Sequence, residues 1–206
     1  MIQRLEKLRL LRELYLLRAF GHRYQEPSLK KEGSFSSFSA KNIEIKHCHL
    51  CERSKTSEPI EGILNLEARL TFITELPIVN VKNEFLQTRS AKMLNDIWDH
   101  IFSKESISVL SILKCGSESN PKSSEIEICK THLHWQLDQI KQTHIICFGG
   151  TESLKIFDYQ DAMLFGKIQS YKKHKLMVTY SLKDLIKNPS LKKEALKHLM
   201  AIKENL

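Results

Sequence analysis

The chain has 206 residues, of which 41% are hydrophobic and 27% are charged, and its formal net charge is +8. This length and balance predict a soluble globular protein with one main domain, and no window approaches the roughly 18 consecutive apolar residues of a membrane span. Residues 1–32 hold eight basic and four acidic residues (net +4), residues 172–206 hold nine and three (net +6), and residues 33–171 hold fifteen and seventeen (net −2). Basic ends on a nearly neutral body favour a polyanionic partner, of which nucleic acid is the leading candidate. The alternative is that these basic residues simply form the solvated faces of helices.

The first 44 residues form a predicted extension. Leucines recur at helical spacing over residues 1–20, with Arg and Glu between them, and Gly21 favours the end of this helix. Its wide leucine stripe predicts that the helix packs on the body of the protein or on a partner. Its charges distinguish it from a signal peptide, so we expect a cytoplasmic location. Pro27, Gly33 and several serines indicate a loop over residues 24–40.

After residue 45, strand-like and helix-like segments alternate. Apolar runs predict strands over 69–74, 107–113, 144–148 and 176–180, and the intervening patterns predict helices over 90–103, 123–142, 151–156 and 189–204. This alternation is typical of a parallel sheet with helices on both faces, whose binding sites lie at the carboxyl ends of the strands. We therefore predict an α/β fold for residues 45–206: a three-layer α-β-α sandwich around a four-stranded, mainly parallel sheet.

Five cysteines in a chain of this kind favour metal or cluster binding over disulfides. Cys48 and Cys51 form a C-x2-C pair, Cys115 follows the second predicted strand, and Cys129 lies in the next helix. Four thiolates from these segments suit zinc or an iron–sulfur cluster; alternatively, the pair is fortuitous and the others are buried thiols. Cys147, inside an apolar strand, is predicted to be a core residue. Four histidines are possible zinc ligands but are more typical of surface or core positions: His47, His49, His132 and His134.

The order of these features is similar to that of a known family. After the C-x2-C pair come a strand ending in Glu-x-Pro, a strand ending in Lys-Cys, a helix with a further cysteine, an apolar strand with Phe-Gly-Gly, and Thr-Tyr-x-x-x-x-Leu. The chain thus resembles the iron–sulfur (family four) uracil-DNA glycosylases over about residues 45–205. The resemblance implies that four cysteines hold a structural [4Fe–4S] cluster near the DNA surface, with zinc as the alternative: Cys48, Cys51, Cys115 and Cys129.

The resemblance is weaker in the first active-site motifs. Glu75 stands where the family has the carboxylate that orients the attacking water, and Pro77 follows it, but both glycines of the family's Gly-Glu-Ala-Pro-Gly motif are replaced. Because glycine permits close backbone approach, we expect a narrowed or refolded pocket. Ser111 stands where the family has the asparagine that reads the uracil edge, and a hydroxyl cannot make the paired contacts of an amide. The position of the aromatic residue that stacks on the flipped base falls at Phe85 or Leu86, and we favour Phe85.

The last motif differs as well. The family has Thr-Tyr-His-Pro where residues 179–182 are Thr-Tyr-Ser-Leu, so Tyr180 remains in the base pocket and Ser181 replaces the histidine that donates to the departing base. Losing one such donor costs about 3–4 kcal/mol, roughly 10²–10³ in rate, of which Ser181 would restore part. Lys187 matches an arginine of the family. The side chains expected to hold DNA phosphates are Lys172, Lys173, Lys175, Lys183 and Lys187, although a solvated hairpin tip is the alternative for the first three.

Retained cysteines beside altered motifs favour a DNA-associated protein of the uracil-DNA glycosylase type in which base excision is lost or altered. Such a protein would bind DNA or a repair or replication protein, the latter docking on the helix at 1–20. The alternative is an active, diverged glycosylase that uses Glu75, Ser111 and Ser181 to hydrolyse the N-glycosidic bond of uracil or another damaged base. A third hypothesis is a zinc-stabilised fold without a role on DNA.

Overall fold

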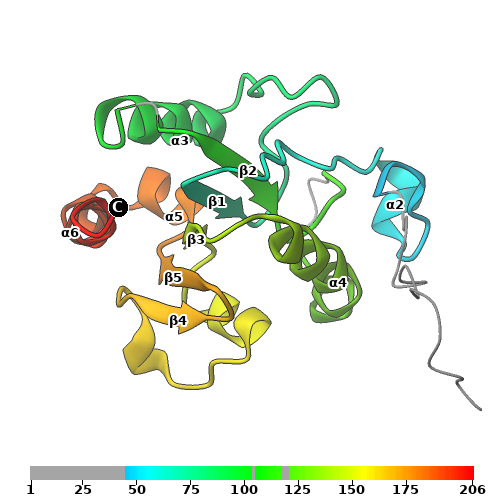
Figure 1. Cartoon of the computed structure of the whole chain (residues 1–206). Helices are drawn as coiled ribbons and strands as arrows, with labels where there is room; N and C mark the ends of the chain where they lie inside the picture. Colours follow the sequence, from blue (N-terminus) through cyan, green and yellow to red (C-terminus); the bar gives the residue numbers. More distant parts are fainter. Residues whose placement is uncertain (1–44, 104, 117–120) are drawn as a thin grey trace, which may run out of the picture. The chain divides into compact units, whose positions relative to one another are not determined.

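The computed structural model describes residues 45–103, 105–116 and 121–206 (Figure 1). The helix predicted over residues 1–20 and the loop predicted over 24–40 lie outside the described residues. In the described part of the chain, every helix is too short or too polar to cross a membrane.

Five strands form one sheet in the order β2-β1-β3-β5-β4 (Figure 1). Four of them are parallel, namely β1 (Leu70–Thr74), β2 (Ile107–Ser111), β3 (His144–Phe148) and β5 (His174–Thr179). β4 (Gln169–Tyr171) pairs antiparallel with β5. The predicted α/β architecture is confirmed, except that the sheet has five strands rather than four.

The additional strand escapes prediction because it is a three-residue segment without an apolar run. β4 pairs with β5 through a tight hairpin in which Tyr171 lies opposite His174. Lys172 in the turn adopts a positive φ of 51°, a conformation that is uncommon for residues with a side chain. The pairing with β5 therefore determines that this segment is a strand, and the residues of the segment alone do not predict it.

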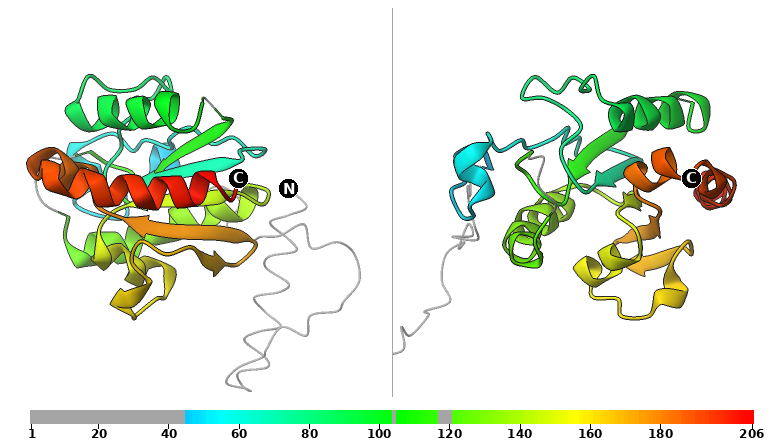
Figure 2. Two further views of the ribbon diagram at one scale, coloured as in Figure 1. Left: turned by 90° about the vertical axis from the view of Figure 1, so that its left-hand side faces the viewer. Right: turned by 180° about the vertical axis from the view of Figure 1, so that it is seen from behind.

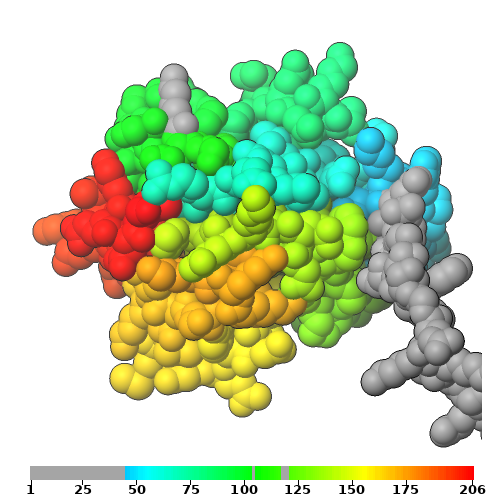
Figure 3. Space-filling view, in the orientation of Figure 1, coloured from blue at the N-terminus to red at the C-terminus, as the bar shows by residue number. Residues whose placement is uncertain are grey.

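Helices cover both faces of the sheet (Figure 2). One face packs on α4 (Ser123–Gln139) and the 3₁₀ segment η2 (Thr151–Phe157), and the other packs on α3 (Arg89–His100), α5 (Leu182–Lys187) and α6 (Lys192–Lys203). The space-filling view shows α6 (red) beside α3 (green) (Figure 3). The remaining described segments are short: η1 (Ile45–His47), α2 (Arg53–Thr56), η3 (Ala162–Leu164) and η4 (Pro189–Leu191).

The two cores follow from the period-two alternation of a strand. Along β3, Ile145 and Cys147 pack with α4, whereas Ile146 and Phe148 pack with the helices of the opposite face. Both sets are almost fully buried, as expected for a parallel sheet covered on two sides. Cys147 is thus a core thiol, as its sequence context predicted.

Three predicted helices are shorter in the structure, and α3 is one of them, since it ends at His100 rather than at residue 103. Ile140 ends α4 because its backbone is extended, with ψ at 140°. The helix predicted over 189–204 divides into η4 and α6, and Pro189 opens the first of these. Proline fits a first turn, where its missing N–H costs nothing.

The register aligns the carboxyl ends of four strands. Thr74 lies opposite both Ser111 and Phe148, and Phe148 lies opposite Thr179. The residues that follow these positions therefore meet at one edge of the sheet, which we call the carboxyl edge. The β4–β5 turn lies at the opposite edge, because β5 begins there at His174.

Candidate functional site

The four candidate ligand cysteines come together from three separate segments. Cys48 and Cys51 lie on either side of the turn between η1 and α2, Cys115 follows β2, and Cys129 lies on α4. Burial raises the pKa of the Cys115 thiol to about 12, and the nearby charges of Cys51, Cys129 and Cys48 raise it further. Burial likewise raises the pKa of Cys129. The structure therefore places all four within electrostatic reach of one another.

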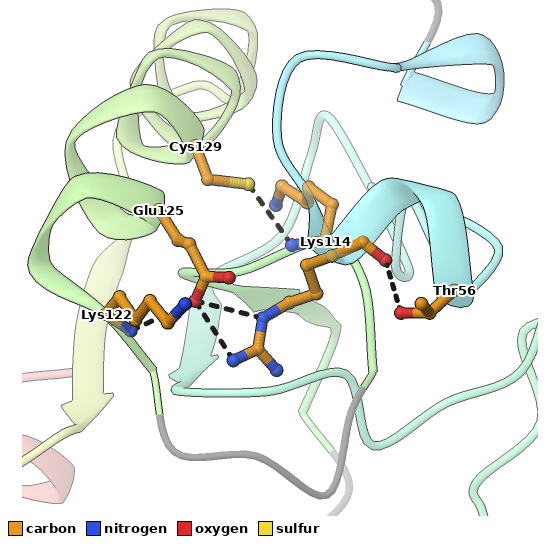
Figure 4. A network of polar contacts seen from close by, with 6 residues as sticks. Thr56, Lys114, Lys122, Glu125 and Cys129 are labelled. Atoms are coloured by element: carbon orange, nitrogen blue, oxygen red, sulfur yellow. Dashed lines mark hydrogen bonds and ion pairs between the residues drawn. The ribbon is translucent and has the colours of Figure 1, made fainter.

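A buried ion pair fixes the C-x2-C segment to α4. Arg53 donates from Nε (3.3 Å) and Nη2 (3.1 Å) to Oε2 of Glu125, and the exposed fractions of the two side chains are 1% and 10%. The same oxygen accepts the backbone N–H of Lys122 at 3.0 Å, at the start of α4 (Figure 4). This N–H and then the Arg53 guanidinium lower the pKa of Glu125. One carboxylate thus joins α2 to the helix that carries Cys129.

Two further groups touch the sulfur atoms directly. The backbone N–H of Lys114 donates to Sγ of Cys129 at 3.3 Å (Figure 4), and Nε2 of His132 lies 3.3 Å from Sγ of Cys48. Of the four histidines considered from the sequence, His132 therefore contacts a candidate ligand. His134 instead pairs through Nδ1 with the hydroxyl of Tyr171 at 2.7 Å.

The donor set fits a four-thiolate group. Within the described ranges, no three His, Cys, Asp or Glu side chains converge closely enough to hold a single metal ion. A zinc ion would draw its sulfurs to about 2.3 Å from one centre. A [4Fe–4S] cluster instead binds each thiolate to a different iron and so holds the thiolates further apart. The thiols are mostly buried and have buried cationic side chains nearby, which suits a negatively charged group held by thiolates.

Glu75 lies at the carboxyl edge beside a cavity of about 390 Å³. It follows β1 directly, and the cavity is also lined by residues that follow β2 and β3, including Ile112, Leu113 and Gly149. Burial raises the pKa of Glu75, while the positive charge of Lys183 opposes this shift. A carboxylate beside a cavity at this edge occupies the usual position of a binding site in an open α/β sheet.

Ser111 and Lys114 share one buried network. Ser111 ends β2 and is 3% exposed, and its backbone carbonyl accepts a hydrogen bond from Nζ of Lys114 at 2.7 Å. Lys114 is 1% exposed, and burial lowers its pKa to about 8. The sequence identified Lys114 only as part of the Lys-Cys pair and did not predict its role. Its position directly after an apolar strand is the feature of the sequence that favours burial of its side chain.

Ser181 is the helix cap of α5. Its Oγ donates to Oδ2 of Asp184 at 2.8 Å and accepts the N–H of the same residue at 3.1 Å. The residue is 4% exposed. The predicted substitute for the family histidine therefore has a structural partner for its proton.

The two predicted base-pocket aromatics lie away from the cavity beside Glu75. The ring of Phe85 packs against Trp98, with centroids 6.4 Å apart, and borders a different hollow with residues of α3. Tyr180 donates its hydroxyl to Glu194 at 2.7 Å, which raises its pKa, and its ring stacks on His198. Pro77 is half-buried in the loop after Glu75.

The five predicted phosphate-binding lysines divide between the two edges of the sheet. Lys183 and Lys187 lie on α5, and Lys183 borders a small hollow with Glu75. Lys172 and Lys173 form the β4–β5 turn, and Lys175 lies in β5 at the opposite edge. Lys172 forms an ion pair with Asp138 at 2.7 Å, and Lys173 donates to the carbonyl of that residue at 2.8 Å. The structure does not bring the two groups together.

Comparison with known proteins identifies the class to which this fold and site belong. The family model of the uracil DNA glycosylase superfamily matches residues 61–201, and the chain belongs to that superfamily. The chain is similar to the type-4 uracil-DNA glycosylase of Archaeoglobus fulgidus (strain ATCC 49558), with 27% identity over 167 residues that cover 73% of this chain and 84% of the relative. The predicted membership of the uracil DNA glycosylase superfamily is confirmed, and the similarity to a type-4 enzyme agrees with the resemblance noted from the sequence. Cys48 and Cys51 precede the residues that the family model matches.

Proposed function

We propose that the chain is a DNA-binding member of the uracil DNA glycosylase superfamily that carries an iron–sulfur cluster and has lost efficient uracil excision. The observation that carries the proposal is the hydrogen bonding of Ser181. A hydroxyl has one proton to donate, and that of Ser181 goes to Asp184. The position where the resemblance places a histidine therefore lacks a free donor for the departing base. The loss of this donor raises the activation free energy of base release by about 3–4 kcal/mol, which slows the reaction roughly 10²–10³-fold.

The arrangement of the base pocket supports the same proposal. Ser111 replaces the asparagine that would read uracil, and its side chain is buried at the end of β2. Phe85 packs against Trp98. A flipped base would therefore lack both the paired amide contacts and the stacking partner that the resemblance implies.

A second candidate function is excision of a different base. Glu75 retains the position of the carboxylate that orients water and borders a cavity of about 390 Å³. A pocket that lacks the asparagine no longer selects a base by the hydrogen-bonding edge of uracil. The cavity and the retained carboxylate together favour an active but diverged glycosylase over a chain with no chemistry at all.

The cluster and the DNA contacts complete the proposal. Cys48, Cys51, Cys115 and Cys129 would hold a [4Fe–4S] cluster, which supplies a structural link between loops and takes no part in base release. Lys183 and Lys187 on α5 would contact the DNA phosphates on the side of Glu75, since Lys183 borders a hollow with that residue. The leucine-rich segment 1–20 remains the predicted docking element for a repair or replication protein.

Single-turnover base release tests the excision hypotheses. Excess protein is incubated with single- and double-stranded DNA that contains uracil, and with DNA carrying other damaged bases. Glu75→Gln is the test variant and Glu67→Gln is the control, because Glu67 is exposed and pairs with Lys141. We expect little or no uracil release. Efficient release that Glu75→Gln abolishes would contradict the loss of excision and establish the second candidate.

Iron content and visible absorption test the cluster. Cys129→Ala should lose the brown colour and the iron, about four atoms per chain, whereas Cys147→Ala should retain both because Cys147 lies in the core of the sheet. A colourless wild-type protein that binds zinc after anaerobic reconstitution with iron and sulfide would contradict the cluster proposal.

A further inference from the structure

The segment from Ser111 to Cys115 contributes Ile112 and Leu113 to the wall of the cavity beside Glu75. The N–H of Ile112 donates to the carbonyl of Thr74 at 2.8 Å, and the N–H of Leu113 donates to the carbonyl of Glu75 at 3.0 Å. The side chains of Ile112 and Leu113 line the cavity. The position of the Glu75 backbone therefore depends on this segment.

The same segment is attached to the cysteine site. The N–H of Lys114 donates to Sγ of Cys129 at 3.3 Å, one residue after the amide that binds Glu75. The carbonyl of Lys114 accepts the N–H of Ile60 at 2.7 Å, and Cys115 forms a β-bridge with Pro59. Two consecutive amides thus point to the two sites, one to a candidate ligand sulfur and the other to the residue at the cavity.

The side chain of Lys114 stiffens this connection. Its Nζ donates to the carbonyl of Ser111 at 2.7 Å and to Oε1 of Gln136 at 2.5 Å, and Gln136 donates in turn to the carbonyl of Glu61 at 2.8 Å. Lys114 is 1% exposed, and the two acceptors that its ammonium contacts in the described part of the chain are neutral. A buried charge needs compensation, and the charges that favour it are those of Cys129 and Glu61.

We propose that Lys114 is a positioning residue that couples occupancy of the cysteine site to the wall of the cavity. The inference rests on the proposed cluster at Cys48, Cys51, Cys115 and Cys129. A bound cluster fixes the Cys129 sulfur as a thiolate acceptor for the Lys114 N–H and provides negative charge beside its ammonium. Loss of the cluster removes both restraints and loosens the pairing of Leu113 with Glu75.

Hydrogen–deuterium exchange measured by mass spectrometry tests the coupling in the full chain. Iron-loaded and iron-free wild-type proteins are compared at a peptide covering 107–116, with a peptide covering β5 as the internal reference. We expect the slowest amides of 107–116 to exchange at least about tenfold faster without iron, while β5 remains unchanged. Equal exchange at 107–116 in both forms, or equal acceleration in both peptides, would overturn the coupling.

Variants locate the effect at the lysine. Loaded Lys114→Met should show faster exchange at 107–116 and a more negative reduction potential of the cluster, because a positive charge that favours the reduced form has been removed. Lys141→Met, which removes an exposed lysine, should change neither. A Lys114→Met protein with wild-type exchange and potential would overturn the proposal. If this variant does not fold, the wild-type comparison decides.

The same samples separate this inference from the proposed function. A wild-type protein that takes up no cluster after reconstitution overturns both proposals. A loaded protein with uncoupled exchange overturns only the role of Lys114.

Discussion

Removal of Glu125 should destabilise the domain far more than removal of an exposed carboxylate. In Glu125→Leu, the Arg53 guanidinium, 1% exposed, loses the carboxylate that it contacts at 3.1 and 3.3 Å. Breaking one partner of a buried pair costs about 3–5 kcal/mol, because the remaining charge stays buried. The double variant Arg53→Met/Glu125→Leu should recover most of this loss, since apolar replacement of a buried pair is often close to neutral.

Urea unfolding followed by circular dichroism measures this free energy, with iron content matched between samples. Glu67→Gln is the exposed control, because both side chains of its ion pair with Lys141 are about two-thirds exposed or more, and it should lose at most about 1 kcal/mol. A loss below about 1 kcal/mol for Glu125→Leu, or a double variant as unstable as the sum of the single variants, would refute the reasoning.

The same pair predicts a pH dependence. The pKa of Glu125 is lowered in the folded state from its ordinary value of 4.5. Its contribution to stability is therefore fully present above about pH 4.5 and is lost as the pH falls through the lowered folded pKa. The stability advantage of the wild type over Arg53→Met/Glu125→Leu should shrink in that window. An advantage that is constant from neutral pH to below the folded pKa would contradict the assigned ion pair.

Three further predictions concern the carboxyl edge. Lys183→Gln should raise the already raised pKa of Glu75, because the charge of Lys183 favours the ionised carboxylate. Carbon NMR of the carboxyl group measures this pKa, and Lys187→Gln should leave the pKa unchanged. Lys183→Ala should weaken DNA binding and reduce the slope of log affinity against log salt by about 0.9. Lys173→Ala, at the opposite edge, should change neither the affinity nor the slope. Equal losses of affinity in the two variants would mean that DNA contacts both edges. Ser181→Ala should lower the free energy of unfolding by about 1 kcal/mol through loss of the α5 cap and should leave any base release that the wild type shows on a damaged base unchanged. Reduced release at full cluster occupancy would instead assign a catalytic role to Ser181.

Local patterns in the sequence determined most of the architecture. Short apolar runs predicted the four parallel strands, because strands buried on both faces read as continuous hydrophobic segments. The same reading missed β4, whose residues carry no such signal and which forms through pairing with β5. The helix ends shifted by a few residues for a similar reason, since they depend on backbone turns such as that at Ile140.

The candidate site was predicted in part. The spacing of the four cysteines predicted a shared site, and the structure brings them within reach of one another. Glu75 was predicted from the resemblance of residues 74–78 to a family motif, and it lies beside a cavity at the carboxyl edge. Both predictions depend on topology that the alternation of strands and helices already implies.

Other features depended on distances that no local pattern contains. Lys172 and Lys183 were grouped by charge, yet the direction of β5 separates them to opposite edges of the sheet. Ser181 was assigned to chemistry, whereas the start of α5 supplies it with Asp184 as a partner. The network of Lys114 joins segments far apart in the chain. The sequence by itself therefore determined the fold class and the set of reactive residues, and the tertiary structure decided which of them meet, because hydrogen bonds and burial are set by the packing of distant segments.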